Sequence, residues 1–265
     1  LMDKGYAYAA NDGTVYFRVK KFKEYGKLSH KNLDDLQSGF RALQVSGEDQ
    51  KEDPLDFVLW KPKKEGEPFW KSPWCDGRPG WHIECSCISM KNLGEYLDIH
   101  CGGIDNIFPH HTNEIAQSES YLGHKWCNYW FHVHHLNDKS GKMSKSKGDF
   151  LTVSLLESKG YDPIVYRMFC LQSHYRKPLE FSYEVMDSVA AGYKKLRNRI
   201  AKLNKDGEVN MEAAKEYKQK FIDVVGNDLN TASGITLIYD VLKEDFNDAT
   251  KFYIIKDFDY VLSLN

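Results

Sequence analysis

A strand, a glycine turn, a helix and a second strand follow one another between residues 96 and 136, and this order restricts the fold more than any other feature. The stretch "YLDIHCGG" is a short apolar run that ends in two glycines. "NIFPHHTNEIAQSESYLG" then has a helical pattern, and "NYWFHVHHL" is again strand-like. Such alternation is typical of a parallel α/β sheet, in which ligands bind beyond the carboxyl ends of the strands. We therefore expect an α/β domain with a binding site after the Gly-Gly turn.

Beyond residue 152 the pattern changes to helices only. Apolar residues recur there at alternating steps of three and four, which is the spacing of one buried helix face. The three stripes consist of Met186, Val189, Tyr193, Leu196, Ile200 and Leu203; of Met211, Ala214, Tyr217 and Phe221; and of Ile235, Ile238, Leu242 and Phe246. The prediction is an α-helical bundle that follows the α/β domain.

The first part of the chain reads differently. A turn signal at Asn11-Asp12-Gly13 precedes the alternating pattern of Val15, Phe17 and Val19, which predicts a strand. Residues 20–79 are charged and rich in proline and glycine, and a single strand-like run at 56–60 interrupts them. This composition favours an irregular surface insertion over a packed unit.

Charge and composition exclude some classes of protein. The formal net charge is -2, so binding of nucleic acid would need a local basic patch and not a global positive field. No apolar run approaches the roughly 20 residues of a membrane span, and no signal-peptide pattern occurs. The six cysteines are scattered through the chain, which favours a reducing, cytoplasmic setting in which cysteines are ligands or core residues.

Two motifs carry chemistry. His110 and Glu114 are four residues apart, so on a helix they share one face and can hold a metal, move a proton or simply pair with each other. "KMSKS", from Lys142 to Ser146, lies in a polar, glycine-flanked loop whose lysines and serines suit phosphate oxygens. An ordinary solvated loop has the same composition, so both interpretations stay open on these residues alone.

Longer strings resemble one family. "KMSKS" resembles the signature loop of class I aminoacyl-tRNA synthetases, which binds the ATP triphosphate. "GEPFWKSPWCDGRPGWHIECS", "DIHCGGIDNIFPHHTNEIAQS", "NYWFH" and "LQSHYRKPLEFS" together resemble the cysteinyl-tRNA synthetases. The resemblance begins at "KGYAYAANDGTVYFRV" and covers nearly the whole chain.

The resemblance implies a zinc site, with one zinc ion per subunit that binds the thiolate of the substrate cysteine. Its ligands in this chain would be Cys85, His110 and Glu114, which are ordinary zinc donors. Apart from this resemblance, a histidine and a glutamate spaced like His110 and Glu114 would more often form a surface ion pair, and Cys85 would more often be a core residue. The family's fourth ligand and its His-x-Gly-His ATP motif do not occur here, so the expectation is a catalytic domain that lacks its N-terminal part.

The resemblance also implies residues for the substrates L-cysteine and Mg-ATP. Lys145 and Lys142, with Ser144 and Ser146, would neutralise the departing pyrophosphate. Gly103 would allow close approach of the nucleotide and Asp105 would accept hydrogen bonds from its ribose. The wall and base of the amino-acid pocket would consist of Trp81, His82 and His100.

The partner that the resemblance implies is tRNA(Cys). A dense basic face on the first long helix suits RNA phosphates, although an ordinary solvated helix has the same pattern. It consists of Lys194, Lys195, Arg197, Arg199, Lys202 and Lys205.

Three domains are expected in this order. Residues 1–151 would form the C-terminal part of a Rossmann-like catalytic domain, 152–183 a stem-contact segment, and 184–265 an incomplete anticodon-binding bundle. We expect a monomer with no membrane contact. A cysteine ligase of the mycothiol pathway and a non-catalytic RNA- or zinc-binding fragment are the alternatives. His134 and His135 have no assigned role.

Overall fold

A computed structural model describes residues 1–32, 50–138, 141–142 and 151–265. The chain divides into two compact units, Leu1–His132 and Val133–Asn265, and each is described by itself. Within the described part of the chain, no helix has the length and apolar character that crossing a membrane requires. The expected domain boundaries near residues 151 and 183 separate regions by their function, and they stay predictions.

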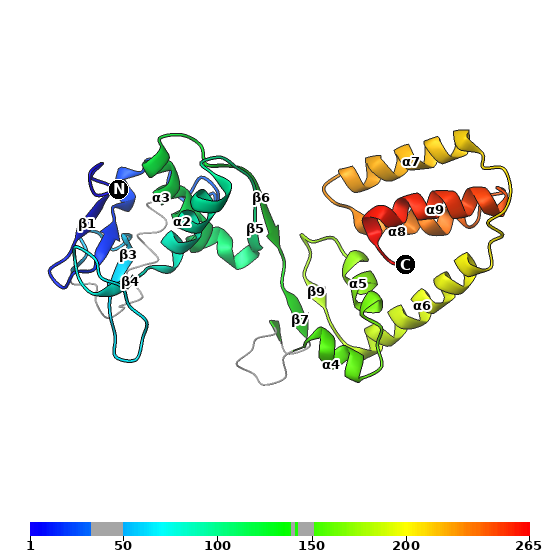
Figure 1. Cartoon of the computed structure of the whole chain (residues 1–265), viewed down its shortest axis with the longest axis horizontal. Coiled ribbons are helices and arrows are strands. Elements are labelled where there is room, and N and C mark those ends of the chain that lie inside the picture. Colours follow the sequence, from blue (N-terminus) through cyan, green and yellow to red (C-terminus); the bar gives the residue numbers. More distant parts are fainter. Residues whose placement is uncertain (33–49, 139–140, 143–150) are drawn as a thin grey trace. The chain divides into compact units, whose positions relative to one another are not determined.

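Unit 1 begins with a four-stranded antiparallel sheet (Figure 1). Its strands, in spatial order, are β1 (Ala7–Ala9), β2 (Val15–Phe17), β3 (Phe57–Pro62) and β4 (Gly77–Pro79). The expected turn joins β1 to β2, and Gly13 adopts a positive φ of 85° there, which L side chains rarely tolerate. The predicted strand ends earlier than expected, because Val19 opens the short 3₁₀ turn η1 (Val19–Lys21).

Within residues 20–79 the strand expected at 56–60 is confirmed as β3, but the expectation that no part of this segment packs into a core is wrong. β3 pairs with both β2 and β4, and its residue Leu59 is buried with Leu55 in the same core as Phe17 and Val19. The charged, proline-rich composition belongs to the β3–β4 connection and hides the long-range pairing on either side of it.

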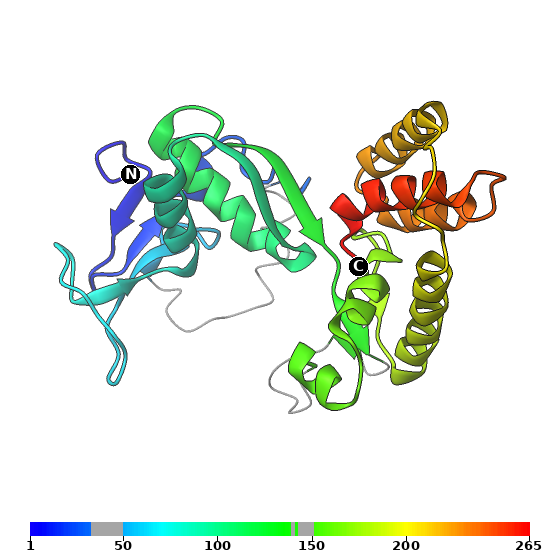
Figure 2. The same ribbon diagram turned by 45° about the vertical axis from the view of Figure 1, so that its right-hand side comes forward.

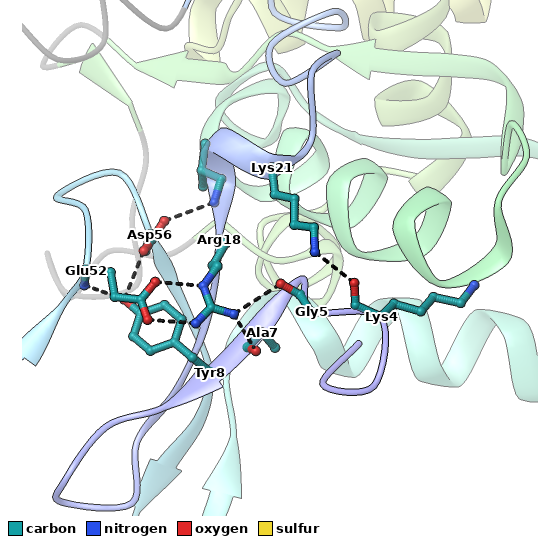
Figure 3. Close-up of polar contacts among 9 residues, drawn as sticks. Lys4, Gly5, Ala7, Tyr8, Arg18, Lys21, Glu52 and Asp56 are labelled. Carbon is teal, nitrogen blue, oxygen red and sulfur yellow. Dashed lines mark hydrogen bonds and ion pairs between the residues drawn. The ribbon is translucent and has the colours of Figure 1, made fainter.

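A polar network fixes residues 52–56 onto β1 and the end of β2 (Figure 3). Asp56 is 2% exposed and accepts hydrogen bonds from the Tyr8 hydroxyl and from the Val19 amide, both at 2.9 Å. The Arg18 guanidinium forms a two-pronged pair with Glu52, at 2.7 Å for each bond. Buried polar groups in this corner are therefore satisfied by partners distant in sequence.

Two helices and two strands complete unit 1. They are α2 (Trp81–Leu93), β5 (Leu97–Gly103), α3 (Thr112–Leu122) and β6 (Cys127–Val133), with the short turns η3 (Ile104–Asn106) and η4 (Ile107–His111) between β5 and α3. β5 pairs with β6, and α2 packs against α3 (Figure 1). The predicted order of strand, glycine turn, helix and strand is confirmed.

Unit 2 starts with a small sheet in the order β8–β7–β9. β7 (Leu136–Asp138) is antiparallel to β8 (Gly141–Lys142) and parallel to β9 (Leu179–Glu180). The helices α4 (Val153–Ser158) and α5 (Pro163–Leu171) lie between β8 and β9 in the chain. The expectation of helices only after residue 152 therefore misses β9, whose two residues are too few to give a periodic signal.

Four longer helices form the rest of unit 2. They are α6 (Tyr183–Ala201), α7 (Met211–Gly226), α8 (Thr231–Val241) and α9 (Asp248–Leu262). Figure 2 shows α7, α8 and α9 packed together, while α6 packs on α5. The predicted stripes supply buried core residues such as Met186, Tyr217 and Ile238, so the helical bundle is confirmed.

Candidate metal and amino-acid site

Three side chains from separate elements of unit 1 converge on one point. Cys85 lies in α2, His110 in η4 and Glu114 in the first turn of α3. One ligand atom from each of the three lies within 4.8 Å of the others. His110 is 5% exposed and Glu114 is fully buried, whereas Cys85 is half-buried.

Hydrogen bonds between α2 and α3 hold these donors in place. The Gln117 amide donates to the His82 carbonyl oxygen at 2.6 Å and to the Ser86 hydroxyl at 2.7 Å. The Ser118 hydroxyl lies 2.8 Å from the Ser86 hydroxyl. Since these residues flank Cys85 on one helix and follow Glu114 on the other, the contacts fix the separation of the two donors.

Glu114 presents its two carboxylate oxygens to different histidines. Oε2 lies 2.7 Å from Nε2 of His100. Oε1 lies 2.7 Å from Nε2 of His110, yet it accepts no hydrogen bond of acceptable geometry from the described residues. Burial raises the pKa of this carboxyl group, but the close contacts with the His100 and His110 rings outweigh burial and lower it to about 2. Glu114 is therefore an anion at neutral pH.

The chemistry of this donor set fits a cation such as Zn²⁺. Burial, and then the nearby Glu114 carboxylate, raise the pKa of the Cys85 thiol. A thiolate next to a carboxylate is unfavourable unless a positive charge lies between them. Thiolate sulfur, imidazole nitrogen and carboxylate oxygen are donor types that zinc accepts, and Oε1 of Glu114 is a buried oxygen without a hydrogen bond from the described residues.

A second contact determines the orientation of His110. Its Nδ1 lies 2.7 Å from Nδ1 of His82, and its ring lies 4.2 Å, centroid to centroid, from that of Trp81. Burial lowers the pKa of His82 to about 4, so this imidazole is neutral at neutral pH. In the tautomer in which the neutral His82 accepts a hydrogen bond from Nδ1 of His110, Nε2 of His110 is unprotonated and can bind a metal ion.

The family follows from comparison with known proteins. Residues 1–191 match the family model described as tRNA synthetases class I (C) catalytic domain. The chain belongs to this family. The expected family and the α/β class of its catalytic part are thus confirmed.

Relatives of this class I synthetase domain include proteins named cysteine--tRNA ligase from Lachnospira eligens, Caldicellulosiruptor saccharolyticus and Clostridioides difficile. Each is 49% identical to this chain, and the matches cover 96%, 92% and 92% of this chain, respectively. The matches cover 58%, 54% and 54% of those proteins, so the chain spans about half the length of the curated relatives it matches.

A solved structure shows the fold of the class I synthetase domain. It is the ternary complex of agnB2 LeuRS from Agrobacterium radiobacter K84 with tRNA and LeuAMS. The TM-score is 0.50 over 74% of this chain and 32% of that chain, at 14% identity. At that identity the likeness concerns the fold alone.

The expected nucleotide-binding residues of the class I synthetase domain lie in separate parts of the chain. Gly103 ends β5 and Asp105 follows it in η3, within two residues of each other. Lys142 belongs to β8. Ser144, Lys145 and Ser146 lie outside the described residues, so their roles stay predictions.

Sequence reasoning missed part of the histidine cluster in this class I synthetase domain. His111 is 2% exposed, and its Nδ1 lies 2.8 Å from Nε2 of His132. With His100 and Glu114, His111 forms a second group of possible ligands within 4.8 Å. A side chain at Gly102 would meet this ring, since an added Cβ would lie 2.6 Å from Cε1 of His111. The Gly-Gly turn was the one signal in the sequence that pointed to this place, but it did not reveal that the His111 ring occupies the space beside Gly102.

Proposed function

We propose that this chain is the cysteine-activating part of a cysteine--tRNA ligase that condenses L-cysteine with ATP and transfers the cysteinyl group to tRNA(Cys). The convergence of Cys85, His110 and Glu114 supports the proposal most strongly, because a thiol substrate needs a thiophilic site. The relatives that are 49% identical carry the corresponding name. A cytoplasmic location is part of the same proposal.

Three side chains of this chain would hold a zinc ion. Cys85 would donate sulfur, His110 its Nε2 nitrogen and Glu114 its Oε1 oxygen. When bound, zinc supplies a positive charge that stabilises the substrate sulfur as a thiolate. Trp81 is 61% exposed beside His110 and would cover the amino acid, while His82 and His100 keep the ligands oriented.

The remaining residues would act on the nucleotide by position and charge. Gly103 and Asp105 follow directly after β5, where an α/β sheet binds ligands, and the Asp105 carboxylate would accept from ribose hydroxyls. Lys142 and Lys145, with Ser144 and Ser146, would contact the phosphates of Mg-ATP. Aminoacyl transfer then needs little covalent participation by the protein, because the protein only has to hold the reactants close together in the correct orientation.

Pyrophosphate exchange on the full-length protein tests the proposal. Exchange between labelled pyrophosphate and ATP should depend on cysteine, and Cys85→Ser should abolish both the exchange and the stoichiometric binding of zinc. Cys87→Ser is the matched control, since Cys87 is exposed on the same helix and should retain both. Cysteine-dependent exchange that survives in Cys85→Ser would contradict the proposed role of this residue.

The acceptor and the selectivity need separate measurements. Adding tRNA(Cys) or an amino-sugar as acceptor distinguishes the ligase from the mycothiol-pathway enzyme, because only one of them should consume the activated cysteine. A hydrophobic pocket separates near-isosteres by about 10–200-fold, whereas a site that demands one specific bond reaches about 10⁴. Retention of full discrimination against serine after zinc removal would show that the metal is not what discriminates.

A further inference from the structure

The connection between β3 and β4 has a defined shape with aromatic side chains on its outside. We call residues 61–77 the aromatic hairpin. Trp70 and Gly77 exchange two backbone hydrogen bonds, at 2.7 and 2.9 Å, and the Lys63 amide donates to the Asp76 carbonyl oxygen. Ser72 accepts from the Trp74 and Cys75 amides and donates to the Cys75 carbonyl oxygen. The segment is therefore folded back on itself.

Its large rings are exposed. Phe69 is 48% exposed, Trp70 58% and Trp74 39%. Exposed apolar rings that gather in one short segment mark an interaction site more often than a single exposed apolar residue does. Tryptophan and phenylalanine present flat faces on which another planar group can stack.

Lysines lie near these rings in the sequence. Two ion pairs neutralise part of the charge, namely Lys63 with Asp76 at 3.2 Å and Glu67 with Arg78, the residue that follows the hairpin, at 2.7 Å. The other charged residues of the aromatic hairpin are one glutamate, Glu65, and three exposed lysines: Lys61, Lys64 and Lys71. The ammonium group of Lys63 lies 4.3 Å from the centre of the Phe69 ring, a cation–π distance. This surface is locally positive on a chain whose formal net charge is -2.

The aromatic hairpin lies close to the proposed metal site in the same unit. Gly77, the backbone partner of Trp70, is four residues before Trp81, which contacts His110. Four extended residues reach at most about 14 Å. One extended substrate strand can therefore touch the aromatic hairpin and approach the site at the start of α2.

We propose that the aromatic hairpin binds unpaired nucleotides of an RNA strand, whose bases stack on Trp70 and Phe69 and whose phosphates contact Lys61, Lys64 and Lys71. This rests on the proposed function, in which the acceptor is an RNA. Interleaved aromatic and basic residues are the means by which proteins bind single strands without reading their sequence. A duplex does not fit this surface, because its base faces are already stacked within the helix.

Binding of short RNA to the full-length protein tests the inference. An unpaired oligonucleotide of mixed sequence and a duplex of equal length would be titrated by fluorescence anisotropy. Trp70→Leu, which keeps apolar volume but removes the ring face, should weaken single-strand binding about 5- to 150-fold, as expected for the loss of one stacked base. Trp70→Phe should bind nearly as the unaltered protein does, and duplex binding should not change.

Controls separate this inference from the proposed function. Tyr96→Leu removes another exposed ring of the same unit, 69% exposed, and should leave binding unchanged. Cysteine-dependent pyrophosphate exchange should be unchanged in Trp70→Leu, which also shows that the variant is folded. Normal exchange together with unweakened single-strand binding by Trp70→Leu overturns the inference alone. Absence of exchange in the unaltered protein overturns the proposed function, whereas the Trp70 dependence of RNA binding would still stand.

Discussion

The Nδ1 atoms of His82 and His110 lie 2.7 Å apart, so one of the two rings carries a proton that the other accepts. Burial keeps His82 neutral by lowering its pKa to about 4. When His110 donates from Nδ1 to this neutral ring, its Nε2, which lies 2.7 Å from Glu114, keeps the lone pair that a metal ion needs. A residue outside the proposed ligand set can thus influence which nitrogen of His110 binds a metal ion.

Replacing His82 by phenylalanine should weaken zinc retention about 10- to 100-fold, the usual effect of losing an outer partner of a metal ligand. The aromatic volume stays, but His110 loses the acceptor for its Nδ1 proton. Competition with a chromophoric chelator measures the change. His124→Phe is the control, because His124 contacts only Lys125 and Tyr96 among the described partners. Equal zinc retention in both variants would contradict the positioning role.

Most of the helical and strand pattern of the site was predictable from the sequence, for a local reason. The helix spacing of His110 and Glu114 and the glycine turn after β5 are visible within a few residues. The structure places both residues as that spacing predicts, although His110 lies in η4 just before α3. The approach of Cys85 to them was inferred from the family and not from spacing, since the two helices are joined through β5.

Contacts between distant segments were not predictable in the same way. The pairing of β3 with β4 depends on residues on either side of the connection between them, and the contact of His111 with His132 joins η4 to the end of β6. Neither contact produces a periodic signal in the sequence. The network of Tyr8, Arg18, Glu52 and Asp56 is a third such case, because each residue alone resembles a surface side chain.

The Asp56 carboxyl group should make stability depend on pH. Burial raises its pKa in the folded state above the usual value of about 3.9. The folded state therefore binds this proton more tightly than the unfolded state does, so the free energy of unfolding falls as the pH rises from about 4 through the folded pKa. In Asp56→Asn the free energy of unfolding should lack this decrease with pH, because the variant has no carboxyl group at this position. Urea unfolding at several pH values measures the difference.

Asp3→Asn is the control for this measurement, since Asp3 is exposed. Its unfolding free energy should follow that of the natural chain at each pH. If the difference between Asp56→Asn and the natural chain does not change between pH 4 and 7, burial of Asp56 does not raise its pKa as inferred.

The bundle of unit 2 should depend on the stacked pair Phe221 and Phe258. Their ring centroids are 4.3 Å apart, and Phe258 is fully buried. Phe258→Ala should lower the free energy of unfolding by about 3–5 kcal/mol, because it removes buried apolar area and leaves a cavity. Tyr260→Ala, at a position 79% exposed on the same helix, should change it by less than about 0.5 kcal/mol. Similar losses in both variants would argue against this packing.

The proposed tRNA contact of α6 predicts a strong dependence of affinity on salt. All six basic residues of the expected face are exposed, including Lys194 and Lys195 on the helix itself. Each lysine that contacts a phosphate releases counterions on binding, so the logarithm of affinity falls linearly with the logarithm of salt concentration. Replacing Lys194 and Lys195 together by glutamine should reduce this slope by roughly two units. Lys215→Gln on α7 is the control, and an unchanged slope in the double variant would place the tRNA elsewhere.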